Sequence, residues 1–490
     1  MIMQLLQHST QTRRLAACGQ PERRRQKAFF EDVRYQFYAT CHPGLEDVVA
    51  AEVSAPEVGG VDVRPGKAGV SFRGDSLEVG YRANLWLRAA IRLLVHVAEG
   101  DLDGRLSGGD ELYRFFRTNV DWPSLLRPGQ TFSVQARVRD CTDIPSSMLV
   151  QIRGRDAICD SIRDSGRERP QPPNASAPAD LPLYAALWRD HITIYRDMSG
   201  DSLHRRGYRS AMHKASLNEA AAAGCLALAG WPHAAAVGKV LADPMCGSGT
   251  FLIEAALMAT HTAPGLYRRR WPFEGWPDFE AAAWRRCVED AKGACRPWKG
   301  TLLGNDIHSG ALALAAKDVE SAGMSRLVKL THGPCLQWRP AQRPAMVVTN
   351  PPWGTRLLGQ THQPGSVPRQ AEEADGAGSE GDLETAWTDL GLFLKGQCPE
   401  ADVAVLSGNK RITALLMMKA DQRIPMTIGG VDCRLIKYKV LPSKPGGLSR
   451  AGSVLSIADN RGGHLELAEL WRRKMIVFLT ATSLSQASQT

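Results

Sequence analysis

The chain has 490 residues, more than a single hydrophobic core usually holds, so we expect two or three domains. Lys and Arg number 60 against 51 Asp and Glu, and the resulting pI near 9.0 suits a polyanionic partner without requiring one. The eleven cysteines form no Cys-x-x-Cys pair, which argues against a zinc site and a disulfide framework, and the apolar stretch Ala220–Trp231 is shorter than the ~20 residues of a membrane span.

Residues 1–34 are predicted to be a basic extension that does not join the fold. Its first thirty residues contain one acid, Glu22, and six basic residues, namely Arg13, Arg14, Arg23, Arg24, Arg25 and Lys27. An Arg-rich segment with few acids is typical of an organellar transit peptide, and a disordered basic arm is the alternative. The first reading implies a chloroplast or another organelle matrix, and the second implies the cytoplasm.

Residues 35–198 are predicted to form an α+β domain. Tyr35–Thr40, Val70–Arg73, Thr131–Arg139 and Leu187–Arg196 have the composition or alternation of strands. Helices are predicted at Gly44–Val53, Asn84–Ala98 and Ser147–Asp164, the second because its apolar residues recur at helical spacing. Arg88, Arg92 and His96 would then form a basic stripe on this helix, either facing phosphates or simply solvated.

The opening sequence Phe37-Tyr-Ala-Thr-Cys-His-Pro-Gly-Leu-Glu46 and the order of these elements resemble a ferredoxin-like segment followed by a THUMP domain. THUMP domains are RNA-binding modules attached to RNA-modifying enzymes, so the resemblance implies an RNA substrate. No residue spacing indicates this independently.

A glycine-rich turn follows in the second half of the chain. Lys239–Thr250 reads Lys-Val-Leu-Ala-Asp-Pro-Met-Cys-Gly-Ser-Gly-Thr, a short strand that ends in Asp243 and a turn that leads into the helix Phe251–Ala259. Glycines permit positive φ and let backbone N–H groups approach a ligand at a helix N-terminus. Taken alone, a Gly-x-Gly turn is weak evidence for a nucleotide site.

Two further signals follow in order. Thr301–Asp306 is a strand that ends in an acid, where nucleotide-binding folds hold ribose hydroxyls, although such an acid is more often a helix N-cap. Val347–Gly354 reads Val-Val-Thr-Asn-Pro-Pro-Trp-Gly, a strand that ends at Asn350 because Pro351 and Pro352 fix φ and remove two donors. The Asn350 amide oxygen and the Pro351 carbonyl could accept from a base amine, with Trp353 as a stacking surface; a Pro-Pro turn beside a buried tryptophan is the plainer interpretation.

Together these three stretches resemble S-adenosylmethionine-dependent methyltransferases that act on exocyclic amines of bases. The resemblance implies that S-adenosylmethionine is held by Asp243, Met245, Cys246, Gly247, Ser248, Gly249, Thr250 and Asp306, and that Asn350, Pro351, Pro352 and Trp353 are catalytic, with no metal. It also implies a Rossmann-like α/β domain over residues 199–445, preceded by the α+β ferredoxin-like/THUMP domain.

Over about 35–440 the chain is similar to bacterial-type 23S ribosomal RNA guanine-N2 methyltransferases. The similarity includes the linker Ser199–Arg209, which closes one side of the cofactor pocket in that family, and the insertion containing Arg270-Trp-Pro-Phe-Glu-Gly-Trp276. Further elements are predicted at Leu217–Leu228, Leu383–Leu394, Ala401–Ser407 and Asp432–Val440. A second methyltransferase domain, present in some relatives, is not expected in the tail 446–490, which has one predicted helix, Leu465–Leu479.

Three features depart from the family or are not accounted for by it. His332–Gln337 lacks the acid that relatives place near the cofactor adenine, so weaker cofactor binding is expected, by about 1 kcal/mol. Trp353 replaces the commoner Tyr or Phe. Residues 359–382 are low in apolar residues, which favours a flexible inserted loop, inert or acting as a lid.

The resulting hypothesis is methylation of a guanine N2 amine in large-subunit ribosomal RNA by a monomer that contacts no membrane. The same chemistry on a transfer RNA guanine or an adenine N6 amine is the close alternative. A noncatalytic RNA-binding or ribosome-assembly factor on a methyltransferase scaffold is the alternative from a different class.

Overall fold

The computed structural model describes residues 35–442 except 103, 105–106, 142, 175–177, 210–216 and 355–379. The predicted N-terminal extension 1–34, nearly all of the 359–382 insertion, and the 446–490 tail with its predicted helix lie outside the described residues. Within the described residues no helix is both long enough and apolar enough to cross a membrane.

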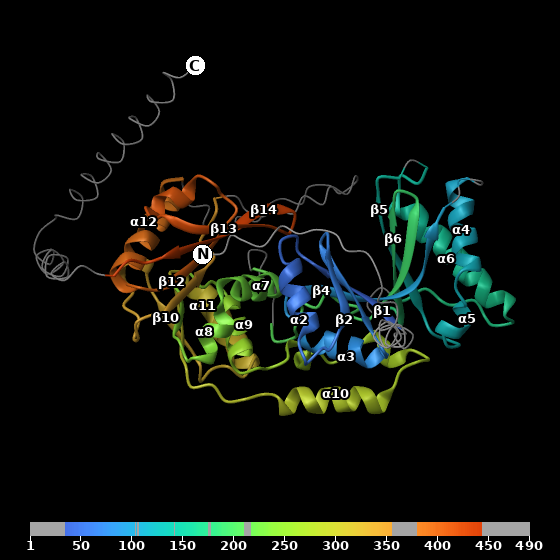
Figure 1. Cartoon of the computed structure of the whole chain (residues 1–490), viewed down its shortest axis with the longest axis horizontal. Helices are drawn as coiled ribbons and strands as arrows, with labels where there is room; N and C mark the ends of the chain where they lie inside the picture. Colours follow the sequence, from blue (N-terminus) through green and yellow to red (C-terminus); the bar gives the residue numbers. More distant parts are fainter. Residues whose placement is uncertain are drawn as a thin grey trace, which may run out of the picture.

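The N-terminal half is built on a seven-stranded sheet with the order β2-β3-β1-β4-β7-β6-β5. All neighbouring pairs are antiparallel except β5 with β6. Its helices cover one face of the sheet (Figure 1), because alternate strand residues such as Phe37, Val95 and Leu183 are buried on that side. The strands are β1 Tyr35–Cys41, β2 Val61–Gly66, β3 Gly69–Gly74, β4 Ala90–Asp101, β5 Phe132–Arg139, β6 Leu181–Trp188 and β7 His191–Asp197; the helices are α2 Glu46–Ser54, α3 Leu77–Trp86, α4 Gly108–Thr118, α5 Trp122–Leu125 and α6 Ser147–Asp164.

The helix predicted over Asn84–Ala98 is wrong. α3 ends at Trp86, and the following residues form β4, the central strand between β1 and β7. Leu93, Leu94 and Val95 are consecutive and all buried, because a central strand can bury both of its faces. Such an apolar run can match helical spacing by coincidence.

The basic stripe predicted on that helix is therefore absent. The Arg88 guanidinium donates to the Thr262 carbonyl at 2.9 Å, and Arg92 pairs with Asp197. His96 Nε2 lies 3.3 Å from the Glu99 carboxylate. Likewise, the single strand predicted over Leu187–Arg196 is a hairpin of β6 and β7, which turns at Arg189 and Asp190, both with positive φ (48° and 64°).

The C-terminal half is built on a second seven-stranded sheet with the order β10-β9-β8-β11-β12-β14-β13. The first five strands are parallel, and β14 lies antiparallel between β12 and β13. Helices α7, α8, α9 and α11 lie together on one side and α12 on the other (Figure 1). The strands are β8 Leu241–Asp243, β9 Leu302–Asp306, β10 Val328–His332, β11 Met346–Thr349, β12 Asp402–Ser407, β13 Ala420–Ile428 and β14 Val431–Lys439; the helices are α7 Glu219–Ala229, α8 Trp231–Ala236, α9 Thr250–Ala259, α10 Ala281–Gly293, α11 Ser309–Ser321 and α12 Glu380–Gln397, with 3₁₀ turns η1 Pro264–Tyr267, η2 Pro272–Gly275, η3 Cys335–Gln337 and η4 Ile412–Leu416.

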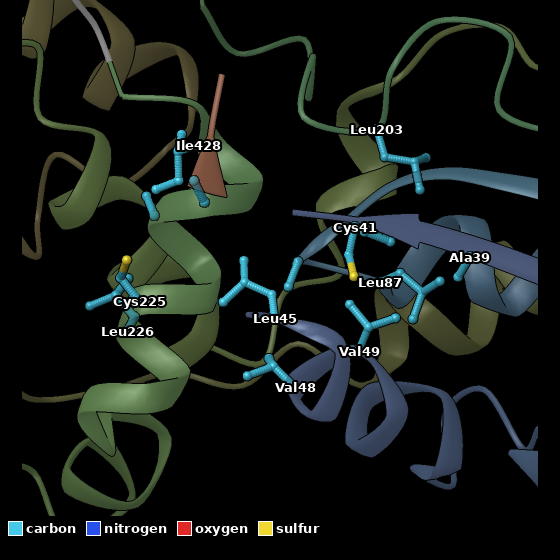
Figure 2. Close-up of a cluster of buried hydrophobic side chains, with 14 of the residues drawn as sticks. Ala39, Cys41, Leu45, Val48, Val49, Leu87, Leu203, Cys225, Leu226 and Ile428 are labelled. Atoms are coloured by element: carbon cyan, nitrogen blue, oxygen red, sulfur yellow. The ribbon is translucent and has the colours of Figure 1, made fainter. Parts of the chain in front are cut away.

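One continuous apolar core joins the two halves. Figure 2 shows Leu45, just before α2, between the α2 residues Val48 and Val49 and the α7 residues Cys225 and Leu226. A Cβ added to Gly224 would lie 2.5 Å from Leu45, so this glycine lets the two halves approach closely.

The insertion between α9 and β9 makes a second contact between the halves. Tyr81 of α3 packs against Phe273 of η2 with ring centroids 4.8 Å apart, and Arg196 of β7 lies 4.2 Å over the Trp276 ring. Arg196 also makes two hydrogen bonds, of 2.9 and 2.8 Å, to the Asp278 carboxylate. The insertion that separates Gly249 from Asp306 in sequence therefore holds the N-terminal sheet against the C-terminal domain.

Candidate functional site

The ends of three adjacent parallel strands carry the polar residues of the candidate site. The chain runs outward from β8 through β9 to β10 and then returns to β11 on the other side of β8, so the strand order reverses at β8. Ligands of open α/β sheets bind outside the carboxyl ends of the strands at such a reversal. Asp243, Asp306 and Asn350 stand at, or directly after, the ends of β8, β9 and β11.

The glycine-rich turn between β8 and α9 has the predicted backbone. Gly247 and Gly249 have φ of 52° and 75°, in the left-handed region that favours glycine. A Cβ added to Gly249 would lie 3.2 Å from the Ala315 side chain, whereas one added to Gly247 would meet nothing within 4 Å. The Gly247 backbone therefore borders open space at the N-terminus of α9, where N–H groups favour anionic groups.

Asp306 connects this turn to the end of β9. The Gly247 N–H donates to its Oδ2 at 2.8 Å, and the His308 N–H donates to its Oδ1 at 2.9 Å. The side chain is buried, yet each carboxylate oxygen can accept a further hydrogen bond. Asp306 can therefore shape the glycine turn and accept from two hydroxyl groups of a ligand.

Asp243 at the end of β8 is 1 % exposed, and its Oδ1 accepts from the Met245 N–H at 3.2 Å. Burial raises the pKa of Asp243 to about 7, and the Asp306 carboxylate adds to the rise, while the Thr349 hydroxyl and the Met245 amide oppose it. Asp243 thus changes charge near neutral pH and would be stabilised in its ionised form by a cationic ligand.

Among the other predicted cofactor residues, Met245 and Ser248 are half-buried. Burial keeps the pKa of the Cys246 thiol well above its ordinary value, so this cysteine is a neutral packing residue. The Cys246 N–H donates to the Asn305 carbonyl at 2.9 Å, and the buried Thr250 hydroxyl accepts from Arg209.

Asn350 presents an acceptor that lacks a partner. Its Oδ1 is buried and has no hydrogen-bond partner in the described part of the chain. Leaving a buried polar atom unpaired is costly, about 1–3 kcal/mol, so such an atom in a ligand site indicates a missing donor. After it, Pro351 is buried and Pro352 exposed, and the Pro352 carbonyl accepts from Trp387 Nε1 at 2.8 Å.

Trp353 lies deeper than a base-stacking residue requires. It is 8 % exposed, its Nε1 donates to the Leu406 carbonyl at 3.1 Å, and a Cβ added to Gly408 would lie 2.5 Å from its ring. These contacts fix the turn against β12 and account for a tryptophan here. Its role in stacking on the target base stays a prediction.

Two residues of this region were missed by sequence reasoning. Asn305 is buried beside Asp306, its Nδ2 donates to the Gly333 carbonyl at 2.9 Å, and its Oδ1 has no partner among the described residues. Arg209 was assigned only to the linker, although it contacts Thr250. The Asn-Asp pair at the strand end could have indicated Asn305, whereas no local signal indicated the Arg209 contact.

The segment after β10 lacks a carboxylate, as its sequence shows, and its Leu336 is 39 % exposed. Ile307, which directly follows Asp306 at the end of β9, is 58 % exposed, and its carbonyl lies 3.1 Å from His332 Nε2. Exposed apolar side chains beside a ribose-type acid suit a flat ring. Over the described ranges, no three His, Cys, Asp or Glu residues are grouped so that they could hold a metal ion.

The strand order, the glycine turn and the strand-end acids define a Rossmann-like methyltransferase domain attached to a ferredoxin-like domain, which confirms the predicted fold class. Residues 206–365 match the family model described as the RMKL-like methyltransferase domain, and residues 36–94 match the model described as the RlmL ferredoxin-like domain. Two segments of the chain are therefore similar to an RMKL-like methyltransferase domain and to an RlmL ferredoxin-like domain.

The chain is 31% identical over 450 residues to the ribosomal RNA large subunit methyltransferase K/L of Saccharophagus degradans. The match covers 90% of this chain and 56% of the relative. The chain thus spans little more than half the length of that relative. Among solved structures, SMU.472, described as a putative methyltransferase complexed with SAH, is 24% identical, with a TM-score of 0.69. The match covers 84% of this chain and 99% of SMU.472. A predicted N6-adenine-specific DNA methylase from Listeria monocytogenes is 25% identical with a TM-score of 0.67 over 84% and 96%.

Proposed function

We propose that the protein transfers a methyl group from S-adenosylmethionine to the N2 amine of a guanine in large-subunit ribosomal RNA. The observation that carries the proposal is the buried, unpaired Oδ1 of Asn350 at the strand reversal, beside Pro351 and Pro352. The exocyclic amine of a base would supply the hydrogen-bond donor that the Asn350 oxygen lacks.

The residues of the site fit this cofactor. The Asp306 carboxylate has lone pairs for the two ribose hydroxyls, and Ile307 and Leu336 offer apolar surface for the adenine. The open space beside Gly247, at the N-terminus of α9, suits the carboxylate of the amino-acid end. Asp243, with its raised pKa, suits the ammonium group or the sulfonium.

S-adenosylmethionine supplies an electrophilic methyl group on a sulfonium, so the chain mainly has to orient the acceptor. The lone pair of a guanine N2 amine is delocalised into the ring and is weakly nucleophilic. By accepting from an amine hydrogen, the Asn350 oxygen orients the nitrogen and stabilises the positive charge that it gains as the N–C bond forms and the S–C bond breaks. The nitrogen then loses one proton to solvent. The two prolines keep the acceptor in place, because they restrict the backbone on its C-terminal side.

The RNA part of the proposal is supported by the open face of the N-terminal sheet. The register pairs His96 with Tyr195 and Tyr195 with Tyr184, which places these side chains on the same face. Tyr38 and Tyr195 have ring centroids 6.2 Å apart beside a hollow that is also lined by Arg64, Arg73 and His96 and by their acidic partners Asp62 and Glu99. Arg137 is exposed on strand β5 of the same sheet. Aromatic rings and arginines on a sheet can stack on unpaired bases and contact phosphates.

The test is to incubate ribosomal RNA from cells that lack the protein with purified enzyme and methyl-labelled S-adenosylmethionine, and to identify the labelled nucleosides by mass. We expect label in N2-methylguanosine of the large-subunit RNA, and none with Asn350→Ala. Label in N6-methyladenosine, or only in transfer RNA, would favour the alternative in which the substrate is an adenine N6 amine or a transfer RNA guanine. Cofactor binding without label in any nucleic acid would favour the noncatalytic scaffold.

A further inference from the structure

Two arginines of the linker between the halves, Arg206 and Arg209, both reach helix α9, but at different places. Arg206 contacts Glu254, and Arg209 contacts Thr250, one helical turn earlier. Thr250 is the first residue of α9 and directly follows the glycine turn. The two arginines therefore differ in whether they touch the proposed cofactor loop.

Arg209 is a buried cation with three partners among the described residues. Its Nη2 donates to the Thr250 hydroxyl and, at 3.3 Å, to the Leu217 carbonyl. Its Nε lies 3.1 Å from the Glu219 carboxylate, and the side chains of this pair are 7 % and 3 % exposed. Arg209 thus connects the first residue of α9 to the start of α7, against which α9 packs.

The glycine turn before α9 is held from the β9 side by hydrogen bonds from the Gly247 N–H to Asp306 and from the Cys246 N–H to the Asn305 carbonyl. The N-cap of α9 is Gly249, which has φ 75° and no side chain to accept from the free N–H groups of the first helical turn. Gly247 borders open space, so no packing holds the turn from that side. The hydrogen bond from Arg209 to Thr250 adds a side-chain contact from the α7 side, at the residue where helix α9 begins.

Stability alone does not account for this ion pair. A guanidinium near the N-termini of α7 and α9 is opposed by both helix dipoles, and a buried pair usually gains no more than apolar packing of the same volume would. The linker beside it packs closely on the insertion, because a Cβ added to Gly207 (φ 113°) would lie 2.5 Å from the Tyr267 carbonyl oxygen. A side chain that reaches Thr250, Leu217 and Glu219 from this linker is suited to setting the geometry of the turn.

We propose that Arg209 is a positioning residue that holds the Gly247–Thr250 turn in the form that accepts the amino-acid end of S-adenosylmethionine. The proposal rests on the proposed function, since it assumes this cofactor. Arg209 acts through Thr250 and Glu219 and takes no part in the methyl transfer itself.

Arg206 provides the matched control. Its guanidinium lies 3.3 Å from Glu254, with side chains 2 % and 0 % exposed, and it donates to the Leu203 carbonyl at 2.9 Å and to the Arg88 carbonyl. Tyr208 donates to the same Glu254 carboxylate at 3.0 Å. Arg206 is thus an equally buried linker arginine that contacts the same helix, but Glu254, Leu203 and Arg88 all lie outside the glycine turn.

The experiment measures the S-adenosylmethionine dissociation constant by calorimetry and the unfolding midpoint for the full chain and for Arg209→Gln, Arg209→Lys and Arg206→Gln. We expect Arg209→Gln to weaken cofactor binding about tenfold or more, since one charge-assisted hydrogen bond no longer holds the turn. Arg206→Gln should lower the unfolding midpoint at least as much but change the dissociation constant less than about twofold, measured below both midpoints.

Arg209→Lys covers the case in which Arg209→Gln does not fold, because it keeps a cation opposite Glu219 but cannot serve Thr250 and Leu217 together. It should fold and bind the cofactor several-fold more weakly than the parent. Equal dissociation constants for Arg209→Lys and the parent, or equal losses for the Arg209 and Arg206 variants, would overturn the inference and leave the proposed function intact. A parent protein that does not bind S-adenosylmethionine would overturn both.

Discussion

The molecule contains two seven-stranded sheets that arrange their polar residues in different ways. In the C-terminal sheet the carboxyl ends of the parallel strands all lie on the same side, which brings Asp243, Asp306 and Asn350 to neighbouring strand ends. In the mostly antiparallel N-terminal sheet successive strands end at opposite edges, so its polar side chains spread over a face, as Tyr184, Tyr195 and His96 do. Parallel strands thus favour a site for a small molecule, and the antiparallel sheet favours a surface for a polymer.

The largest expected effect is at the end of β9. Asp306→Ala should abolish measurable S-adenosylmethionine binding, because it removes both the proposed ribose acceptor and the partner of the Gly247 N–H. Calorimetric titration measures this, with the unfolding midpoint as a control for folding. A folded variant that binds as tightly as the parent would show that the cofactor lies elsewhere.

Asn350→Ala should lower turnover by about 10²-fold or more and leave cofactor affinity nearly unchanged, since the lost contact strengthens only in the transition state. Single-turnover rates with labelled cofactor separate the two quantities. Equal losses of binding and turnover would indicate collapse of the turn that Pro352 and Trp353 anchor on Trp387 and β12.

Substitutions on the N-terminal sheet should change RNA binding and leave cofactor binding unchanged. Tyr184→Ala combined with Arg137→Ala should weaken RNA binding by about tenfold and reduce its salt dependence, without changing cofactor affinity. Filter binding at several salt concentrations tests this. Met148→Ala, an exposed residue on the helical side of the same domain, is the matched control. If both variants bind RNA alike, the open face is not the RNA surface.

The smallest expected effect is a change in proton binding at Asp243. Burial raises the pKa of Asp243 to about 7 in the folded chain, whereas its pKa in the unfolded chain is near 4. Between these two pH values the folded chain binds a proton that the unfolded chain has lost. The stability that this proton contributes is therefore present at low pH and is lost as pH rises from about 4 to about 7. A cationic cofactor lowers this pKa again, so binding at pH 7 should release a fraction of a proton.

Calorimetry of cofactor binding in buffers of different ionisation enthalpy measures that release. Asp243→Asn should abolish it and should also flatten the dependence of stability on pH between about 4 and 7. Proton release that is unchanged in Asp243→Asn would assign it to another group.

The sequence predicted strands of both sheets. Strands β1, β3 and β5 of the N-terminal sheet and β9, β11, β12 and β14 of the C-terminal sheet were predicted to within one or two residues, because short apolar or alternating runs between glycines, acids and prolines allow few alternatives. β2, β10, β13 and several helices were not predicted, and β4 was read as a helix. Helix α6 was predicted with its observed bounds, Ser147–Asp164, since it is long and periodic and its N-cap Ser146 accepts from the Met148 N–H.

By itself, the sequence determined the local chemistry of this protein: the glycines with positive φ, the strand that stops at Asn350, and the acids that end β8 and β9. These features depend on backbone geometry that a few neighbouring residues dictate. Only the tertiary structure decided that β4 is a central strand, that Trp353 is buried, that the insertion holds the two halves together, and that Arg209 reaches Thr250. Those outcomes depend on contacts between residues far apart in the chain, and packing against distant partners outweighs local preference.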